Sequence, residues 1–374
     1  MKQLFAINGI TFTLEAEDGV PAAEILCRKI APLAVEAGKP DIRFILTSEL
    51  PRIAEPFTKL EKFRIGRTTM YGTGHSRLNY SVSREEDGSL KVLMCPIRKS
   101  GLKEFGERLN KGWKYYIRYG CDLDTCMAKR FLSNLMLPVL FFVMAERGMT
   151  FVHCSAVAKD GRSFLFPAWG GVGKTSLMSH FLANGWNYIC DDLTVMDREG
   201  SIHHFPIPMH IYRYHKKVCP AMTESMERAM TAKERSLWNF AAHFVGESKL
   251  VRWIEPARVF GEENIVRKAP LGTVIHMQRS SAPGKIQLEP STPERLAGYI
   301  CNTIVNEIGD IGLMTSLPNA IDALDFIPDL STVLNDVKSV AVEAMKNAEL
   351  YEMLLPSDAT PEETYRFLAE KWKF

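Results

Sequence analysis

The stretch Ala168-Trp169-Gly170-Gly171-Val172-Gly173-Lys174-Thr175, residues 168–175, decides which fold this chain is predicted to have. It fits the Walker A pattern: Ala or Gly, four residues of any kind, then Gly-Lys followed by Ser or Thr. Glycines let the backbone curl so that successive N–H groups point inward at an anion, where a Cβ would intrude. The helix expected next presents its unpaired N–H groups and partial positive charge to the same point. The pattern therefore predicts a phosphate-binding loop.

The positions of this loop have distinct expected tasks. Lys174 is expected to reach the outer phosphates of a nucleoside triphosphate, and the Thr175 hydroxyl to join the shell of a Mg²⁺ ion. The cofactors predicted are thus ATP and Mg²⁺, although nothing in the loop separates adenine from guanine. The residues predicted to bind the nucleotide are Ala168, Trp169, Gly170, Gly171, Val172, Gly173, Lys174, Thr175 and Ser176.

The residues around the loop predict the setting that such a motif needs. Two strands, Phe151 to Ala158 and Ser163 to Phe166, are predicted before it, joined by a tight turn at Asp160-Gly161. A helix from about Thr175 to Asn184 is predicted after it, with Gly185 placed to end that helix. Together they predict a strand, the loop and a helix in direct succession.

A pair of adjacent carboxylates follows the predicted helix. Asp191 and Asp192 lie 17 and 18 residues past Lys174, at the end of a short predicted strand, Asn187 to Cys190. A carboxylate at the end of a neighbouring strand is where Mg²⁺ needs an oxygen ligand, so the predicted metal ligands are Thr175, Asp191 and Asp192. Adjacent side chains of a strand point to opposite faces, so one Asp would hold metal and the other would face the substrate. Taken alone, the pair fits a turn or a helix cap as well.

His153 is a further candidate, but a weaker one when considered alone. It lies 21 residues before Lys174, in the apolar strand that starts at Phe151. A single histidine in such a strand is typical of a protein core.

The order of these features resembles the HPr kinase/phosphorylase superfamily, whose P-loop core is related to phosphoenolpyruvate carboxykinase. The resemblance covers about Phe151 to Asp197. It rests on His153-Cys154-Ser155-Ala156, Asp160-Gly161, the loop from Ala168 to Thr175, Gly185-Trp186 and Asp191-Asp192, in that order. It implies an α/β fold with an α+β mixed sheet, of the HPr kinase/phosphoenolpyruvate carboxykinase type, with an N-terminal α+β domain.

The resemblance also implies roles for single residues. Lys174 would contact the β- and γ-phosphates, and His153 would approach the transferring phosphoryl group. One of Asp191 and Asp192 would complete the metal site while the other accepts the proton of the acceptor hydroxyl. The catalytic set expected is therefore Asp191, His153 and Lys174. The implied activity is an ATP- and Mg²⁺-dependent kinase that acts on a hydroxyl, with serine of a protein or peptide, or a small molecule, as acceptor.

The chain departs from the family pattern downstream of the Asp pair. The Glu-x-Arg-Gly signature is absent, and Tyr214-His215-Lys216-Lys217 stands at about that distance. Two alternatives therefore stay open: a nucleotide-binding regulator or pseudokinase without transfer activity, and a plain NTPase that uses water. Four arginines beyond the pair are not separated by the sequence as candidates for transition-state stabilisation: Arg213, Arg252, Arg258 and Arg279.

The rest of the chain predicts two domains. Residues 1–148 are expected to form an N-terminal α+β domain of unknown role, with a hairpin at Asn8-Gly9 and a long helix from Thr125 to Arg147. Residues 149–374 are expected to form the HPr-kinase-like P-loop domain, with a helical insertion near 222–248. Thr231 and Glu234 in the insertion are spaced as a capping box, and Thr360-Pro361-Glu362-Glu363 is expected to start a terminal helix in the same way.

Composition narrows the classes of partner and compartment. With 46 basic and 44 acidic residues among 374, the chain has no basic excess for nucleic acid. The longest apolar stretch, Phe131 to Ala145, is shorter than the roughly 20 residues of a membrane span, so a buried helix and no membrane partner are expected. The eight cysteines form no C-x-x-C pair and the N-terminus shows no secretory signal, which predicts reduced thiols and a cytoplasmic location. Whether the chain forms a homo-oligomer stays open.

Overall fold

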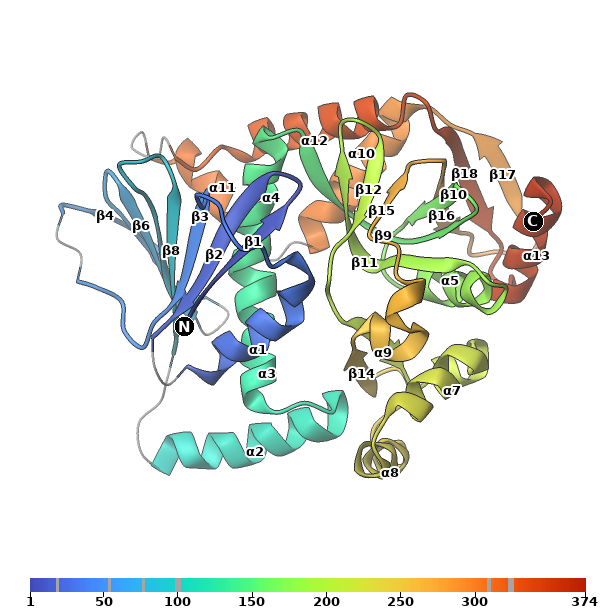
Figure 1. Cartoon of the computed structure of the whole chain (residues 1–374), viewed down its shortest axis with the longest axis horizontal. Helices are drawn as coiled ribbons and strands as arrows, with labels where there is room; N and C mark the ends of the chain where they lie inside the picture. Colours follow the sequence, from blue (N-terminus) through green and yellow to red (C-terminus); the bar gives the residue numbers. More distant parts are fainter. Residues whose placement is uncertain (18–19, 53–54, 76–77, 98–101, 308–310, 322–325) are drawn as a thin grey trace. The chain divides into compact units, whose positions relative to one another are not determined.

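The computed structural model describes residues 1–17, 20–52, 55–75, 78–97, 102–307, 311–321 and 326–374 (Figure 1). The chain divides into two compact units. The first comprises Met1–Tyr116, Cys121–Phe142 and Ile308–Thr332, and the second comprises Ile117–Gly120, Val143–Glu307 and Val333–Phe374. The sequence predicted two contiguous domains that meet near Gly148. In the structure, the chain leaves the first unit after Phe142 and returns to it once more.

The first unit contains an eight-stranded sheet in the order β1-β2-β3-β8-β7-β6-β5-β4. The predicted hairpin at Asn8-Gly9 is confirmed: both residues have positive φ, 49° and 87°, as a two-residue turn between twisted strands requires. The strands are β1 Lys2–Ile7, β2 Ile10–Ala16, β3 Ile42–Leu46, β4 Thr58–Leu60, β5 Phe63–Ile65, β6 Thr69–His75, β7 Leu78–Arg84 and β8 Leu90–Pro96. The helices that lie wholly in this unit are α1 Pro21–Ile30, α3 Leu123–Phe131 and α11 Ile311–Ser316, while α2 Leu102–Tyr119 extends beyond it.

The long helix predicted from Thr125 to Arg147 is confirmed, and its irregularity has a clear cause. A π-turn at Leu132–Met136 separates α3 from α4 (Leu137–Glu146), and the Leu137 N–H donates to the Leu132 carbonyl five residues back. Pro138 follows directly; it has no N–H to donate and its ring crowds the preceding turn, so the wider turn relieves the strain. By length and composition the span Leu123–Glu146 is one that could cross a membrane, and 72% of its most apolar window is buried inside the structure.

The second unit is built on a mixed eight-stranded sheet in the order β15-β12-β11-β9-β10-β16-β18-β17. β10 runs antiparallel to β9 and parallel to β16, so the sheet is of the mixed type that the sequence predicted. Its strands are β9 Met149–Lys159, β10 Arg162–Pro167, β11 Asn187–Asp197, β12 Ser201–His204, β15 Lys268–Pro270, β16 Thr273–Arg279, β17 Gln287–Pro290 and β18 Glu349–Leu355. A small separate sheet pairs β13 Met209–Tyr212 with β14 Val251–Ile254.

Helices cover both faces of this sheet (Figure 1). Successive residues of β10 alternate between two cores, as the pleat of a strand requires. Phe164 and Phe166 face the core that includes α5, whereas Leu165 faces the core that includes α10 and α12. The helices are α5 Lys174–Ala183, α6 His215–Val218, α7 Pro220–Ala229, α8 Ala232–Ala241, α9 Pro256–Phe260, α10 Pro293–Glu307, α12 Leu330–Ala344 and α13 Pro361–Trp372.

One predicted boundary in this unit was wrong. The sequence placed the end of a strand at Cys190, just before the Asp pair, but β11 continues through the pair to Asp197. The residues after the pair, Leu193 to Met196, are buried and pair with β9, so sheet pairing extends the strand past the two polar side chains. The Asp pair therefore lies within a strand.

The predicted helical insertion consists of two helices, α7 and α8. The Thr231 hydroxyl accepts a hydrogen bond from the Glu234 N–H, and the Glu234 carboxylate accepts one from the Thr231 N–H. The predicted capping box therefore starts α8. Met222 and Met226 of α7 are buried in the same core as α5. The insertion thus packs against the helix that follows the P-loop.

A cluster of aromatic rings attaches α5 to the sheet and to the C-terminal residues. The ring of Phe181 is fully buried, and its centroid lies 5.1–5.6 Å from those of five neighbours: Phe164, Phe166, Trp186, Tyr365 and Phe374. Pairs at such spacing contribute beyond the burial of their area.

We expect Phe181→Ala to lower the free energy of unfolding by about 3–5 kcal/mol, because it leaves a cavity among five rings. Urea denaturation followed by tryptophan fluorescence measures the change. Phe244→Ala is the matched control, since this side chain is 74% exposed and its loss should leave the transition unchanged. Equal shifts for both variants would contradict the packing described.

Candidate functional site

The predicted phosphate loop joins β10 to α5 in the second unit. Gly171 and Gly173 have φ values of 82° and 115°, a backbone conformation that side chains with a Cβ rarely adopt. Gly173 stands at the N-cap of α5 and provides no side-chain cap for the first turn of the helix. The loop thus leads directly into the first turn of α5, whose N–H groups have no side-chain cap. That residues 168–176 bind phosphate stays a prediction.

Lys174 is buried and lies against the loop from within. Its Nζ donates to the Ala168 carbonyl at 2.9 Å and to the Trp169 carbonyl at 3.1 Å. A third contact joins Nζ to the Nε2 of His153 at 2.8 Å. A lysine ammonium can only donate, so His153 accepts through Nε2 and carries its proton on Nδ1.

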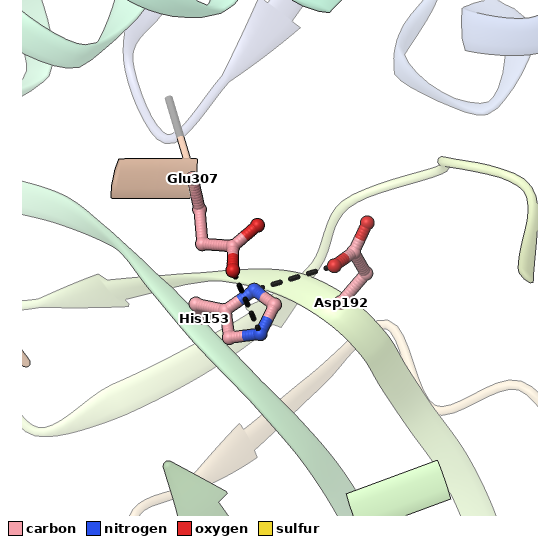
Figure 2. Close-up of side chains that lie close together, drawn as sticks. All are labelled: His153, Asp192 and Glu307. Atoms are coloured by element: carbon pink, nitrogen blue, oxygen red, sulfur yellow. Dashed lines mark ion pairs between the residues drawn. The ribbon is translucent and has the colours of Figure 1, made fainter. Parts of the chain in front are cut away.

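Two carboxylates also lie beside the ring of His153, one at each ring nitrogen, as Figure 2 shows. Its Nδ1 lies 3.3 Å from an oxygen of Asp192, and its Nε2 lies 3.7 Å from an oxygen of Glu307. The contact with Asp192 has the distance of an ion pair without the alignment of a hydrogen bond, so Nδ1 stays unsatisfied among the described residues. The line Lys174–His153–Asp192 thus connects the end of the P-loop with a partly exposed carboxylate.

Thr175 and Asp191 form a second contact beside the first. The Thr175 hydroxyl donates to both carboxylate oxygens of Asp191, at 2.9 and 3.1 Å. Asp191 is buried, whereas the Asp192 side chain is 34% exposed. Ser155, opposite Asp191 in the strand pairing, donates to the Lys174 carbonyl and ties β9 to the start of α5.

A backbone irregularity brings both aspartates to this place. β11 has a bulge between Tyr188 and Cys190, and Asp192 has φ 95°, which is rare outside glycine. Alternation along β11 would turn Asp191 and Asp192 to opposite faces, as the sequence predicted. The positive φ instead allows the Asp192 carboxylate to contact His153, while Asp191 contacts Thr175.

Burial shifts the pKa of Lys174 and the pKa of Asp191 in opposite directions. It lowers the pKa of Lys174, against the opposing effect of Asp191 and Asp192. It raises the pKa of Asp191 from 3.8 to about 6, with the neighbouring Asp192 adding to the rise and the Thr175 hydroxyl opposing it. Perturbed groups of this kind, gathered at one end of a P-loop, are typical of functional sites.

The metal ligands predicted from the sequence fall into two groups in the structure. Thr175 and Asp191 offer oxygens only, which suits Mg²⁺. Asp192 lies instead with His153 and Glu307, whose ligand atoms are all within 4.8 Å of one another. A set with an imidazole nitrogen suits a transition metal better than Mg²⁺, and its Nε2 is already occupied by Lys174.

Glu307 is the residue of this site that the sequence did not reveal. It is the last residue of α10 and follows the Asp pair by more than 100 residues, with no motif around it. Its carboxylate oxygen lies 3.9 Å from the position that a Cβ on Gly170 would take, so it lies close to the loop as well as to His153.

The structure separates the four arginines that the sequence left equal. Arg279, the last residue of β16, donates to the Val172 carbonyl of the loop at 3.4 Å. Arg213 pairs with Glu227, and Arg258 with Glu234. Arg252 is buried and donates to backbone carbonyls. Among these four, Arg279 is therefore the arginine at the phosphate loop.

A cavity of about 740 Å³ opens on one side of the loop. It is lined by Gly171, Gly173 and Lys174–Ser176, and beyond them by side chains from α5, α6, β16 and the start of α13. Trp169 and Gly170 are not among its lining residues. The indole of Trp169 is 52% exposed, and Gly170 lies close to Glu307.

Comparison with known proteins gives little further support. No protein-family model matches the chain, and no curated protein matches it in sequence. Among solved structures, it is similar to the structure of the Hpr(Ser) kinase/phosphatase from Coxiella burnetii, with a TM-score of 0.28 and 11% identity over 60% of this chain and 99% of that chain. A TM-score this low carries no weight for fold or function, so the contacts of the site residues must support any functional conclusion.

The raised pKa of Asp191 predicts a stabilising substitution. Between pH 3.8 and about 6 the unfolded chain loses the proton of this carboxyl while the folded chain keeps it, so folding stability falls as pH rises through that window. The difference corresponds to on the order of 3 kcal/mol. In EDTA at pH 8, Asp191→Asn should therefore be more stable than the wild type, and the gain should shrink toward pH 4.

Urea denaturation at pH 4, 6 and 8 measures this difference. Asp160→Asn is the matched control, because asparagine tolerates the positive φ of 49° at that turn and the site is untouched. A gain for Asp191→Asn that does not depend on pH would contradict the explanation.

Proposed function

We propose that this chain is an ATP- and Mg²⁺-dependent kinase that transfers the γ-phosphoryl group to a hydroxyl. One observation supports this most directly: Lys174 of the P-loop contacts His153, and His153 contacts the partly exposed carboxylate of Asp192. An ammonium, an imidazole and a carboxylate thus stand in line at the end of a phosphate-binding loop. The geometry offers charge for a phosphoryl group and a base for its acceptor in adjacent positions.

The loop would hold the phosphates. Backbone N–H groups around Gly171 and Gly173 and the first turn of α5 would bind their oxygens. The Lys174 ammonium, now donating to loop carbonyls, would donate to the outer phosphates instead. Phosphoryl transfer passes through a loose transition state, so catalysis here would rest on positioning and charge neutralisation.

Thr175 and Asp191 would hold the metal. A Mg²⁺ ion held there would supply positive charge against the negative charge that develops on the phosphates. Thr175 would supply its hydroxyl oxygen, and Asp191 would orient that hydroxyl or supply a carboxylate oxygen of its own. The positive charge would also offset the burial of the Asp191 carboxylate, whose pKa is raised to about 6 by desolvation.

Asp192 would act as the base that accepts the proton of the acceptor hydroxyl. The expected catalytic set named Asp191, and the choice of base between the two aspartates was open; both oxygens of Asp191 accept from Thr175, which favours Asp192 as the base. Asp192 is more exposed and contacts His153, which would orient it toward the transferring group. Serine of a protein or peptide, or a small hydroxyl compound, is the acceptor class that the sequence resemblance supports.

We expect Lys174→Ala to lower the rate of transfer by at least about 100-fold, because it removes the buried cation that faces the phosphates. Incubation with radiolabelled ATP and hydroxyl-bearing peptides measures the rate. Lys346→Ala is the control, since this exposed lysine pairs with Glu343 at the end of α12 and does not line the cavity beside the loop. Unchanged transfer and nucleotide binding in Lys174→Ala would overturn the proposal.

The same assay separates the proposed kinase from two other activities. Steady release of phosphate without any acceptor would indicate an NTPase. Binding of ATP without transfer or release would indicate a nucleotide-dependent regulator.

Substitutions of the two aspartates should impair phosphoryl transfer in different ways. Asp191→Asn should raise the Mg²⁺ concentration for half-maximal activity, because it weakens the metal site, whereas Asp192→Asn should lower kcat at saturating Mg²⁺ and leave nucleotide affinity unchanged. Titrations of Mg²⁺ at fixed ATP distinguish the two effects. Identical titration curves for the two variants would contradict this division of roles.

A further inference from the structure

The cavity beside the loop extends far past the phosphate cradle. Most of its lining residues lie outside the P-loop: His180 on α5, Tyr214, His215, Lys217 and Val218 around α6, Arg279 at the end of β16, and Ala359–Glu362 at the start of α13. A volume of about 740 Å³ is typical of pockets that enclose a whole small ligand. The phosphates would occupy only the end of the cavity next to the loop. The side chains that line the rest of the cavity indicate which part of a ligand lies there.

A polar group without a partner lies beside this cavity on α5. Ser176 and His180 are one helical turn apart, so both lie on the cavity face of α5. The Nε2 of His180 is buried and has no hydrogen-bond partner among the described residues. Burial lowers the pKa of His180, and a hydrogen bond with the Val218 backbone opposes this shift. Nε2 is therefore the ring nitrogen left for a ligand.

An aromatic surface lies in the same cavity. Tyr214 is half-buried, and its ring stacks on Tyr212 at 5.5 Å and meets the edge of His215 at 4.4 Å. Two ring neighbours fix its orientation, so it offers a rigid flat face. Such a face suits a planar base, because base–aromatic stacking tolerates any base.

A cation lies between the two ends of the cavity. Arg279 donates from Nη2 to the Val172 carbonyl of the loop and from Nη1 to the Ser357 carbonyl before α13. No carboxylate pairs with it in the part of the chain that the structure describes. Its charge is therefore available to a phosphate that leaves the loop toward α13.

We infer that this cavity is the nucleoside subsite: Tyr214 and His180 hold the base, and Arg279 holds the phosphate nearest the sugar. The inference rests on the proposed function, because it takes the loop as the site of the outer phosphates. It assigns a ligand to the segment Tyr214-His215-Lys216-Lys217, which the sequence showed only as a departure from a family signature. Specificity for a nucleotide over free polyphosphate would arise here.

Two probes test this inference with the full chain. Titration calorimetry with Mg²⁺ measures binding of ATP and of inorganic tripolyphosphate, which has the phosphates without the nucleoside. Tyr214→Ala and His180→Ala should each weaken ATP binding by about tenfold and leave tripolyphosphate binding unchanged. Tyr214→Phe keeps the ring and should bind ATP as the wild type does, which shows that the site remains folded. His243→Ala, an exposed histidine outside the cavity, is the control.

The outcomes separate this inference from the proposed function. Equal loss of both ligands in Tyr214→Ala and His180→Ala, or unchanged ATP binding in both, would overturn the nucleoside subsite alone. Lys174→Ala should weaken both ligands. If the wild type binds neither ATP nor tripolyphosphate, the proposed phosphate-binding role of the loop is overturned, and the nucleoside subsite with it.

Discussion

The candidate site in the second unit depends on the hydrogen-bond acceptors of one buried ammonium group, that of Lys174. Lys174 is only 7% exposed, and its Nζ donates to two loop carbonyls and to His153. A buried charge without such partners costs several kcal/mol, on the order of the penalty for an unpaired ion in a protein interior. Of these three acceptors, His153 is the one that lies outside the loop. The position of β9 next to β10 is therefore as important to the site as the loop sequence.

The sheet order meets this requirement directly. β9 lies between β10, which leads into the loop, and β11, which holds the Asp pair. Cys154 pairs with Pro167 on one side and with Asp192 on the other, so His153, the end of β10 and the carboxylates share one level of the sheet. Three sequence segments separated by helices and turns thus meet at one edge of the phosphate loop, and α10 adds Glu307 from its last turn.

The parts of this structure that the sequence predicted are those that local rules control. The turns at Asn8-Gly9 and Asp160-Gly161 require positive φ, and the capping boxes at Thr231 and Thr360 satisfy helix N–H groups within four residues. Each can be recognised in a short window, because its energy comes from neighbours in the chain.

The parts that the sequence did not predict depend on distant pairing. β11 continues past Asp192 because β9 provides hydrogen-bond partners for it, and no local pattern shows that support. The same holds for Glu307, whose place near His153 is set by how α10 packs against the sheet. The return of Ile308–Thr332 to the first unit is likewise a property of tertiary packing. Residue types identified the chemistry, and pairing determined which residues meet.

Several local costs coincide at this one site. Burial raises the pKa of Asp191 to about 6 and lowers the pKa of Lys174. Asp192 adopts φ 95°, a strain of roughly 1–3 kcal/mol for a residue with a Cβ. A fold selected for stability alone would replace these groups with apolar side chains, which often stabilise a buried position better than an ion pair does. Under the proposed function, a bound cation and polyphosphate would offset the two burial costs, since they would supply positive charge to Asp191 and negative charge to Lys174. Under that proposal the burial of both charged groups serves ligand binding, whereas the backbone strain at Asp192 places its carboxylate beside His153.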